Sequence, residues 1–372
     1  MNLLSLERIA PEAVMSNVTE LNIGFMPLTD CAPIVMAHEL GLFRKYGLKV
    51  TLDRQNSWAT LRDKLHAGLL DAVQMLAPMP FASTLGIGGQ QHPVMTPFVL
   101  SFNGNAITIS QHLSAEIVAI NNLNKLSLPL SSGLLKKLIA MRKSNGKKVR
   151  FATVHPNSCH YYQLMSWLKM SGISLAEISI VVLPPSEMVT ALEEDYIDAF
   201  CVGGPWNAEA VRKGAGTTVL TSSDIWSDSP EKVLGVSQFW YQQNQGTTQM
   251  LIAALQESCH WLEHVPNRFE AARVLATRQY LDTNLDVIAP SLLGSCLTQR
   301  REPPRRIPSY NQFSMLDKPN GNAPEHTQGE RILQYMVEAG HIDRKEIPEA
   351  LISNVYRSDI YERFSQITAD IK

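Results

Sequence analysis

The feature that most constrains this chain is the way its short apolar runs end at proline or glycine. These runs alternate with segments of helical periodicity, which is the pattern of an α/β protein. Five of them stop at turns: P-L-T-D (27–30), A-P-M-P (77–80), H-P-N-S-C-H (155–160), P-P-S-E (184–187) and G-G-P-W-N (203–207). In open α/β sheets, ligands bind beyond the carboxyl ends of the strands. Ordinary turn chemistry explains any one of these turns, but the five together predict a ligand cleft.

The alternation falls into two series, which indicates two lobes. In the first series, apolar runs at 21–26, 48–53 and 72–76 predict strands, with a helix near 58–67. The second series begins with the strand V-R-F-A-T-V at 149–154. A chain of 372 residues also exceeds what one compact core usually holds. We therefore expect an N-terminal extension (1–18), a discontinuous first lobe with a helical C-terminal part (19–110 and 221–372) and a second lobe (111–220).

Composition and charge argue against several classes of protein. The formal net charge of −2 provides no basic field for phosphates, so direct nucleic-acid binding is not expected. No run of about 18 or more consecutive apolar residues predicts a membrane span. Charged residues interrupt the apolar N-terminus, so no signal peptide is recognisable, and we expect a cytoplasmic protein provided that Met1 is the natural start. Five scattered cysteines without C-x-x-C spacing predict reduced, buried thiols.

Motifs for enzymatic chemistry are absent from the sequence. It contains no G-x-S-x-G, no H-E-x-x-H and no P-loop. Cys159 and His160 are adjacent, but sequence neighbours point in different directions on a helix, so a catalytic pair is not expected. The sequence thus predicts a protein that is not an enzyme, with no catalytic residue, no metal site and no cofactor.

Six motifs occur in the same order as in a known family. They are L-N-I-G-F-M-P-L-T-D-C-A-P-I-V-M-A, S-W-A-T-L-R-D-K, M-L-A-P-M-P, F-N-G-N-A-I-T-I-S, F-C-V-G-G-P-W-N and P-E-K-V-L-G-V. From about residue 20 to 240 the chain resembles the nitrate/bicarbonate-binding proteins typified by NrtA and CmpA. The resemblance implies a type II periplasmic-binding-protein fold, with two α/β lobes around a ligand cleft.

Within that family, the chain is most similar to the cytoplasmic nitrate sensors of the NasS type, because it shows no recognisable export signal or lipid anchor. This resemblance implies a nitrate/nitrite-binding sensor that sequesters a NasT-type (ANTAR) transcription antiterminator while it is ligand-free. Anion binding would release the antiterminator and so regulate nitrate assimilation. Two alternatives stay open: a substrate-binding subunit of a nitrate/bicarbonate-type ABC transporter, and an enzyme like the thiamin-pyrimidine synthases, whose cysteine-rich motif is not found here.

The resemblance also implies a set of ligand contacts. Four side chains match the family's nitrate-binding pattern: Trp58, Gln111, His160 and Lys232. Backbone at three further positions corresponds, less closely, to the wall of the site: Thr60, Pro185 and Val202. Without the resemblance, the simpler interpretations are a core tryptophan, a surface amide, a helix-cap histidine and a solvated lysine.

These residue types suit the anion that the family binds. Nitrate is flat, singly charged and a weak hydrogen-bond acceptor, so a site must compensate for its removal from water. Lys232 would supply a positive charge, whose attraction for the anion is stronger in a closed cleft than at a surface. Gln111 and His160 would supply N–H donors, and the Trp58 indole a flat wall with one donor. Trp58 and the turn 77–80 are thus expected beside one pocket.

The sequence departs from the family at one position. The family often reads V-G-E-P-W-N, whereas this chain has Gly204 in place of the acid. The missing acid disfavours a calcium-assisted bicarbonate site, and we expect it to affect the hinge or the selectivity between nitrate and nitrite. The arginines of R-R-E-P-P-R-R (300–306) are a candidate partner surface, with a solvated loop as the simpler alternative.

Overall fold

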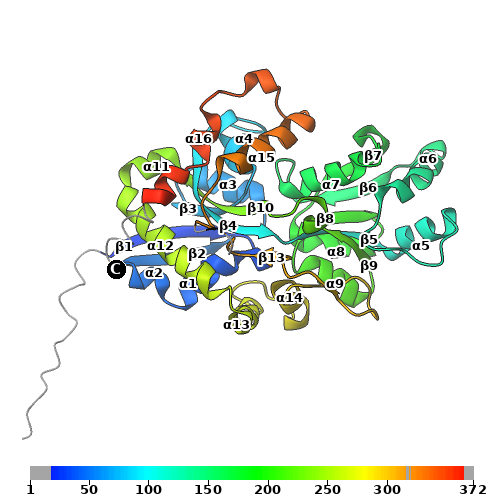
Figure 1. Ribbon diagram of the computed structural model, residues 1–372, viewed down its shortest axis with the longest axis horizontal. Helices are drawn as coiled ribbons and strands as arrows, with labels where there is room; N and C mark the ends of the chain where they lie inside the picture. Colours follow the sequence, from blue (N-terminus) through cyan, green and yellow to red (C-terminus); the bar gives the residue numbers. More distant parts are fainter. Residues whose placement is uncertain (1–17, 316–317, 319, 364–372) are drawn as a thin grey trace, which may run out of the picture.

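The computed structural model describes residues 18–315, 318 and 320–363. Apart from Val18, the predicted N-terminal extension therefore lies outside the described residues. Within them the chain forms two α/β lobes, each built on one main sheet, and the two sheets stand side by side in Figure 1. The α/β class predicted from the alternating pattern is confirmed.

The first lobe is built on a six-stranded sheet in the order β13-β4-β10-β3-β1-β2. Its strands are β1 (Thr19–Phe25), β2 (Leu48–Arg54), β3 (Ala72–Leu76), β4 (Val94–Asn103), β10 (Pro230–Ser237) and β13 (Asn311–Gln312). Strand β1 pairs in parallel with β2 and β3, whereas β10 runs antiparallel between β3 and β4. Every residue of β3, β4 and β10 is buried, so the centre of this sheet is covered on both faces.

Helices on the two faces of this sheet belong to two separate apolar clusters. One cluster takes in α1, α12 and α13, and the other takes in α3, α4, α15 and α16. The helices of this lobe are η1 (Thr29–Cys31), α1 (Ala32–Glu39), α2 (Leu42–Lys45), α3 (Trp58–His66), α4 (Met79–Leu85), α11 (Gln238–Gln243), α12 (Gln245–Trp261), α13 (Val265–Leu275), α15 (His326–Glu338), η5 (Arg344–Glu346) and α16 (Leu351–Val355).

The second lobe is built on a five-stranded sheet in the order β7-β6-β8-β5-β9. Its strands are β5 (Asn105–Ser110), β6 (Val149–Thr153), β7 (Ile178–Val182), β8 (Ala199–Gly203) and β9 (Gly216–Thr221). Strands β6, β7 and β8 are parallel, and β5 runs antiparallel to β8 and β9. Its helices are α5 (Gln111–Ile120), η2 (Ser132–Leu135), α6 (Lys136–Ser144), α7 (Cys159–Lys169), η3 (Leu175–Glu177), η4 (Pro185–Glu187), α8 (Met188–Glu193), α9 (Trp206–Lys213) and α10 (Ser222–Ile225).

The chain first passes between the lobes at Gly104, because β4 ends at Asn103 and β5 begins at Asn105 (Figure 1). Gly104 has a φ of +94°, and a Cβ there would overlap the Oδ1 atom of Asn311, so only glycine fits. Residues 105–110, which the sequence placed in the first lobe, form β5 of the second sheet. The lobe boundary therefore falls about one strand earlier than predicted.

The C-terminal part visits the second lobe again before it returns to the first. Helix α14 (Leu285–Leu292) packs on α9, and β11 (Ser295–Cys296) pairs with β12 (Arg305–Arg306). The stretch 297–328, which includes the candidate partner surface at 300–306, contains β12, β13 and the start of α15. Arg305 in this segment donates to Asp224 over 2.7 Å, so it is already paired within the chain and is not a free cation for a partner.

Two further predictions can be compared with the structure. All five cysteines are buried and none is paired in a disulfide, as the sequence predicts. Across the described residues, no helix has both the length and the apolar character that crossing a membrane requires.

Candidate functional site

A group of buried polar side chains lies where the two sheets meet. We call it the interlobe cluster: Asp30, Trp58, Gln74, Asn105, His160, Gln163, Glu231 and Lys232. The first lobe contributes Asp30 from η1, Trp58 from α3, Gln74 from β3 and the pair Glu231–Lys232 from β10, and the second lobe contributes the remaining members from β5 and α7. Each of the eight side chains belongs to a residue that is almost completely excluded from solvent.

Lys232 is the charged centre of the interlobe cluster. Its Nζ lies 2.8 Å from Asp30 Oδ2 and 2.8 Å from Glu231 Oε1, and all three residues are at most 1% exposed. The same ammonium lies 5.5 Å from the centroid of the Trp58 ring, within the range of a cation–π contact. Gln74 Nε2 donates to Asp30 Oδ1 over 2.6 Å, which fixes the carboxylate from its other side.

The second lobe contacts this charged centre at Glu231, which belongs to β10 of the first lobe. Asn105 Nδ2 donates to Glu231 Oε2 over 2.6 Å and to Gln163 Oε1 over 3.0 Å. His160 Nε2 lies 3.6 Å from Glu231 Oε1, which is too long for a hydrogen bond. Glu231 is therefore the residue through which the polar groups of the two lobes are joined.

Burial sets the protonation of the cluster. Burial and the nearby Lys232 hold the pKa of His160 well below its usual value, so the imidazole is neutral. Burial disfavours the charged form of Lys232 and so acts to lower its pKa. The carboxylates of Asp30 and Glu231 have a larger opposite effect and raise the lysine pKa to about 12. Burial also raises the pKa of Glu231, against the opposing effect of Lys232.

Several polar atoms of the cluster have no hydrogen-bond partner although they are buried. They are Nε1 of Trp58, Nδ1 and Nε2 of His160, Nε2 of Gln163 and Oδ1 of Asn105, with Oγ1 of the neighbouring Thr153. Buried polar groups are nearly always paired, and leaving one unpaired costs about 1–3 kcal/mol. With His160 neutral, three of these six atoms are N–H donors, and the Thr153 hydroxyl can donate as well. A ligand that accepts several hydrogen bonds would satisfy these donors.

Two helices begin at the cluster, and each is capped by a serine. Ser57 Oγ accepts from Thr60 N at the start of α3, and Ser158 Oγ accepts from Tyr161 N at the start of α7. Trp58 and His160 consequently sit in the first turns of these helices. A helix N-terminus carries partial positive charge, which favours a negatively charged ligand.

Gln111 does not belong to the interlobe cluster, so this expectation is corrected. It is exposed, it begins α5, and its Nε2 lies 3.3 Å from Thr217 Oγ1. Asn105 and Gln111 stand at opposite ends of β5, roughly 17–20 Å apart at about 3.3 Å per residue. The amide at the cluster is therefore Asn105, at the start of the strand, and not the amide that follows it.

The three predicted wall residues have different positions. Thr60 is exposed and bonds only to Ser57, so its side chain faces away from the cluster. Pro185 is buried and follows β7, the edge strand, at the same sheet edge as the ends of β6 and β8. Val202 is fully buried in β8, and its carbonyl accepts from Asn207 Nδ2 over 2.8 Å.

The sequence contained signals for the cluster members that the prediction missed. Asn105 and Glu231 stand inside the motifs N-G-N-A-I and P-E-K-V, and Gln163 lies three residues after His160, on the same face of a helix. Asp30 ends the turn P-L-T-D after the first predicted strand, so it also had a signal. Gln74 had none, because it lies inside an apolar run and only the fold brings it to Asp30.

Gly204, where the family often has an acid, lies at the junction of the lobes. Its carbonyl accepts from Thr29 N over 2.9 Å, and its N–H donates to Gly104 O over 3.3 Å. A Cβ at position 204 would lie 2.8 Å from Thr29 Oγ1 and 3.0 Å from Ser291 Oγ. A side chain at this position therefore requires the Thr29 side chain or its surroundings to shift.

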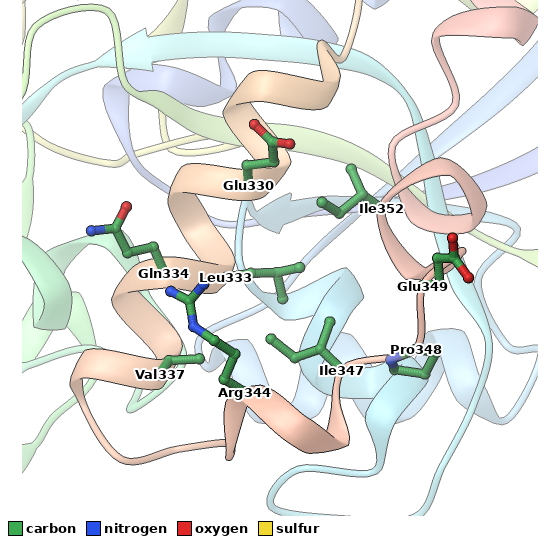
Figure 2. Close-up of a pocket in the computed structure, with 9 residues that line it drawn as sticks. All are labelled: Glu330, Leu333, Gln334, Val337, Arg344, Ile347, Pro348, Glu349 and Ile352. Atoms are coloured by element: carbon green, nitrogen blue, oxygen red, sulfur yellow. The ribbon is translucent and has the colours of Figure 1, made fainter.

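Other pockets lie at the surface and do not include the interlobe cluster. Figure 2 shows one of about 380 Å³, formed by α15, η5 and α16, with Leu333, Ile347 and Ile352 along its walls and Glu330, Arg344 and Glu349 around them. In the residues that the structure describes, no group of three or more His, Cys, Asp or Glu side chains is arranged to hold a metal ion.

The family of the chain follows from comparison with known sequences. A model of the NMT1-like family matches residues 15–276. The chain belongs to the NMT1-like family. This NMT1-like protein is 31% identical to the nitrate/nitrite binding protein NrtA of Synechococcus elongatus, over 92% of this chain and 77% of that protein. The relationship to the nitrate/bicarbonate-binding proteins, predicted from the six motifs, is thereby confirmed.

A longer relative and a solved structure extend the comparison. The nitrate import ATP-binding protein NrtC of Synechocystis is 35% identical over 92% of this NMT1-like chain, which spans 49%, about half, of that relative's length. The crystal structure of the periplasmic nitrate-binding protein NrtA from Synechocystis superposes with a TM-score of 0.85 at 25% identity, covering 94% of this chain and 89% of that one. The predicted periplasmic-binding-protein fold is confirmed.

Proposed function

We propose that the interlobe cluster binds nitrate or nitrite, and that the chain is a cytoplasmic sensor of these anions. The observation that supports this most directly is the set of unpaired buried donors around a buried lysine. Trp58 Nε1, His160 and Gln163 Nε2 come from both lobes and have no partner. Relatives with the same fold are nitrate-binding and nitrate-import proteins by name.

A small planar anion suits this arrangement chemically. Three oxygens in one plane accept hydrogen bonds from several directions, and the flat Trp58 ring offers a surface of matching shape. Because donors come from both lobes, an anion between them favours the closed arrangement over an open one. In this proposal the cluster stabilises a bound anion, and the chain acts as a binding protein.

The sensor role rests on coupling between ligand and partner. We infer that the ligand-free form holds a NasT-type antiterminator of the ANTAR class, and that the closed form releases it. If the partner prefers the open form and the anion the closed form, each weakens the binding of the other by the same factor. The support for this partner is the resemblance of the sequence to NasS-type sensors.

Titration calorimetry tests anion binding directly. We expect nitrate and nitrite to bind with measurable heat and chloride to bind more weakly. Lys232→Met should abolish binding, whereas Lys45→Met, which removes an exposed lysine paired with Glu257, should not. Absence of binding at millimolar nitrate by a folded wild-type protein would overturn the proposal.

Co-purification with the antiterminator tests the sensor role. The partner should be retained without nitrate and released with it, and K232M should retain it under both conditions if the variant folds. Partner binding that is unaffected by an anion that calorimetry shows to bind would overturn the sensor role but leave the binding site intact.

A second candidate function is supported by the names of the relatives. NrtA and NrtC are components of nitrate uptake, so this chain could instead be the substrate-binding part of an ABC transporter. The two functions use the same site and differ in location. Fractionation of cells that express the natural gene separates them, because a transport receptor would be recovered outside the cytoplasm.

A further inference from the structure

The interlobe cluster carries one more negative charge than positive charge before any anion enters. Asp30 and Glu231 are carboxylates, Lys232 is a cation and His160 is neutral. In the described part of the chain, Lys232 is the only lysine or arginine that pairs with either carboxylate. A bound monoanion would leave two uncompensated negative charges in a site where these residues are at most 1% exposed. Burial of unpaired charge is strongly unfavourable, so binding needs a compensating positive charge.

The proposed function requires an anion here, and the following inference rests on it. We propose that the interlobe cluster binds its monoanion together with one proton, which Glu231 takes up from solvent. The step is a simple protonation: one carboxylate oxygen of Glu231 gains a hydrogen, and no other bond is made or broken. The site then binds nitrate or nitrite as an anion–proton pair.

The geometry selects Glu231 and not Asp30 as the group that takes the proton. Both oxygens of Asp30 accept from groups with a fixed donor: Lys232 Nζ, and Gln74 Nε2, whose amide is oriented because its Oε1 accepts from Met26 N over 2.9 Å. Glu231 Oε2 instead faces the amide of Asn105, whose Oδ1 is buried without a partner. The two ends of an amide have nearly the same shape, so this amide can turn over.

Rotation of the Asn105 amide couples protonation of Glu231 to binding of the anion. With Glu231 ionised, Asn105 Nδ2 donates to the carboxylate over 2.6 Å. With Glu231 protonated, the turned amide places Asn105 Oδ1 where it accepts from the carboxylic acid. Nδ2 then leaves both Glu231 Oε2 and Gln163 Oε1 and is available to donate to the anion. Protonation thereby removes a negative charge and frees an N–H group in the same step.

The other titratable groups around Glu231 do not change charge near neutral pH. Burial raises the pKa of Cys159 on α7, of Cys201 on β8 and of Tyr356 after α16, so all three stay neutral. Lys232 remains protonated because its pKa is about 12. His160 remains neutral because burial and Lys232 lower its pKa. The burial that raises the pKa of Glu231 agrees with a carboxyl group that gains a proton readily.

Calorimetry in buffers of different ionisation enthalpy measures the number of protons bound. Nitrate titrations at about pH 7, 8 and 9 should show that the protein takes up protons as it binds nitrate. The number taken up should rise with pH toward one proton per anion. The nitrate association constant of the wild type should fall by up to tenfold per pH unit over this range. Glu231→Gln should take up no proton and bind nitrate with an affinity that does not depend on pH. Glu257→Gln, a change at a half-buried carboxylate that pairs with Lys45 outside the cluster, should bind nitrate as the wild type does.

The outcomes separate this inference from the proposed function. Nitrate binding by the wild type with no proton uptake at any of the three pH values would overturn the inference and leave the function standing. An affinity that depends on an added divalent cation, again without proton uptake, would also overturn it. Absence of nitrate binding at every pH would overturn the proposed function. The wild-type measurements decide between these outcomes even if E231Q does not fold.

Discussion

At the scale of single residues, Lys232 is a charged group whose burial in the interlobe cluster costs free energy. Removing two carboxylates and an ammonium from water costs several kcal/mol per ion, and their attraction returns this only with good geometry. The 2.8 Å contacts of Lys232 with Asp30 and Glu231 provide that geometry. Such a group is weak evidence for stability, so we attribute its burial to ligand binding.

Trp58→Phe tests the role of the indole N–H. Phenylalanine retains the flat apolar face against Lys232 but removes Nε1, the buried donor without a partner. We expect nitrate affinity to fall by about five- to thirtyfold, corresponding to about 1–2 kcal/mol for one hydrogen bond to an anion. Calorimetry measures the affinity and urea unfolding the stability, which should change far less. An unchanged affinity would show that the indole N–H does not contact the anion.

Gly204→Ala tests the close contact between the lobes. The added Cβ would lie 2.8 Å from Thr29 Oγ1, so we expect a loss of about 1–3 kcal/mol in the free energy of unfolding. Gly246→Ala is the matched control, since a Cβ there meets no atom within 4 Å and Gly246 lies within α12. The control should be stabilised by about 0.5–1 kcal/mol, because alanine favours helix. Urea unfolding measures both, and equal effects would contradict the proposed crowding at Gly204.

At the scale of elements, the cluster depends on where helices α3 and α7 begin. A cap fixes the first turn, and the first turn positions Trp58 on α3 and His160 on α7. The Ser158 hydroxyl also donates to the His155 carbonyl over 2.6 Å, so it ties the turn after β6 to the helix. The sequence around these caps therefore fixes the direction from which each lobe approaches the cluster.

Ser158→Ala tests this dependence. Loss of the cap should lower the free energy of unfolding by about 1–2 kcal/mol and also weaken nitrate binding, because His160 and Gln163 lie on the helix that the cap orients. The control is Ser174→Ala, which removes the cap of the exposed helix η3 in the same lobe. The control should lower stability without a change in affinity. Equal loss of affinity in both variants would indicate general destabilisation only.

At the scale of the whole molecule, two of the passages between the lobes are bonded to each other: the passage at Gly104 and the one that leads into β10. Asn103 N donates to Ser229 O over 2.9 Å, and Ser229 N donates to Asn103 Oδ1 over 3.3 Å. The first passage is adjacent to Asn105 and the second to Glu231, both in the interlobe cluster. Movement of the lobes about these passages therefore moves the cluster.

Buried histidines predict that the protein loses stability in mild acid. Burial lowers the pKa of His66 and His155 to about 4 and that of His160 well below its usual value of 6.5. The unfolded chain then binds more protons than the folded chain below about pH 6.5. The stability that these groups contribute is therefore present above pH 6.5 and is lost as the pH falls toward 4. We expect the free energy of unfolding to decrease by about 2–3 kcal/mol between pH 7.5 and 5.5. The raised pKa of Glu231 acts in the opposite direction and makes this decrease smaller.

Urea unfolding as a function of pH checks this expectation. His155→Asn should flatten the dependence, since it removes one buried imidazole. His264→Asn, at an exposed position, should leave the dependence unchanged. A dependence that is the same in His155→Asn and the wild type would contradict the assignment to buried histidines.

The sequence predicted the central strands more accurately than it predicted the residues of the cluster. The run 72–76 forms β3 as predicted, because an apolar run bounded by turn residues suits a buried central strand. Strand β9 was not predicted, because its threonine-rich sequence gives a weak apolar signal and its pairing with β5 stabilises it. Gln111 was chosen by its place after a strand, but only the direction of β5 shows which end of that strand faces the cluster.

The sequence by itself determined the α/β class, the two lobes, the family, and the importance of Trp58, His160 and Lys232 as cluster residues. These follow from local periodicity, turn residues and ordered motifs, which are short-range properties of the chain. The tertiary structure alone decided that Asp30 meets both Lys232 and Gln74, that Asn105 and not Gln111 lies in the cluster, and that the cluster has an excess negative charge. Those facts depend on pairing between strands far apart in sequence, and the spacing of residues along the chain does not specify which strands become neighbours.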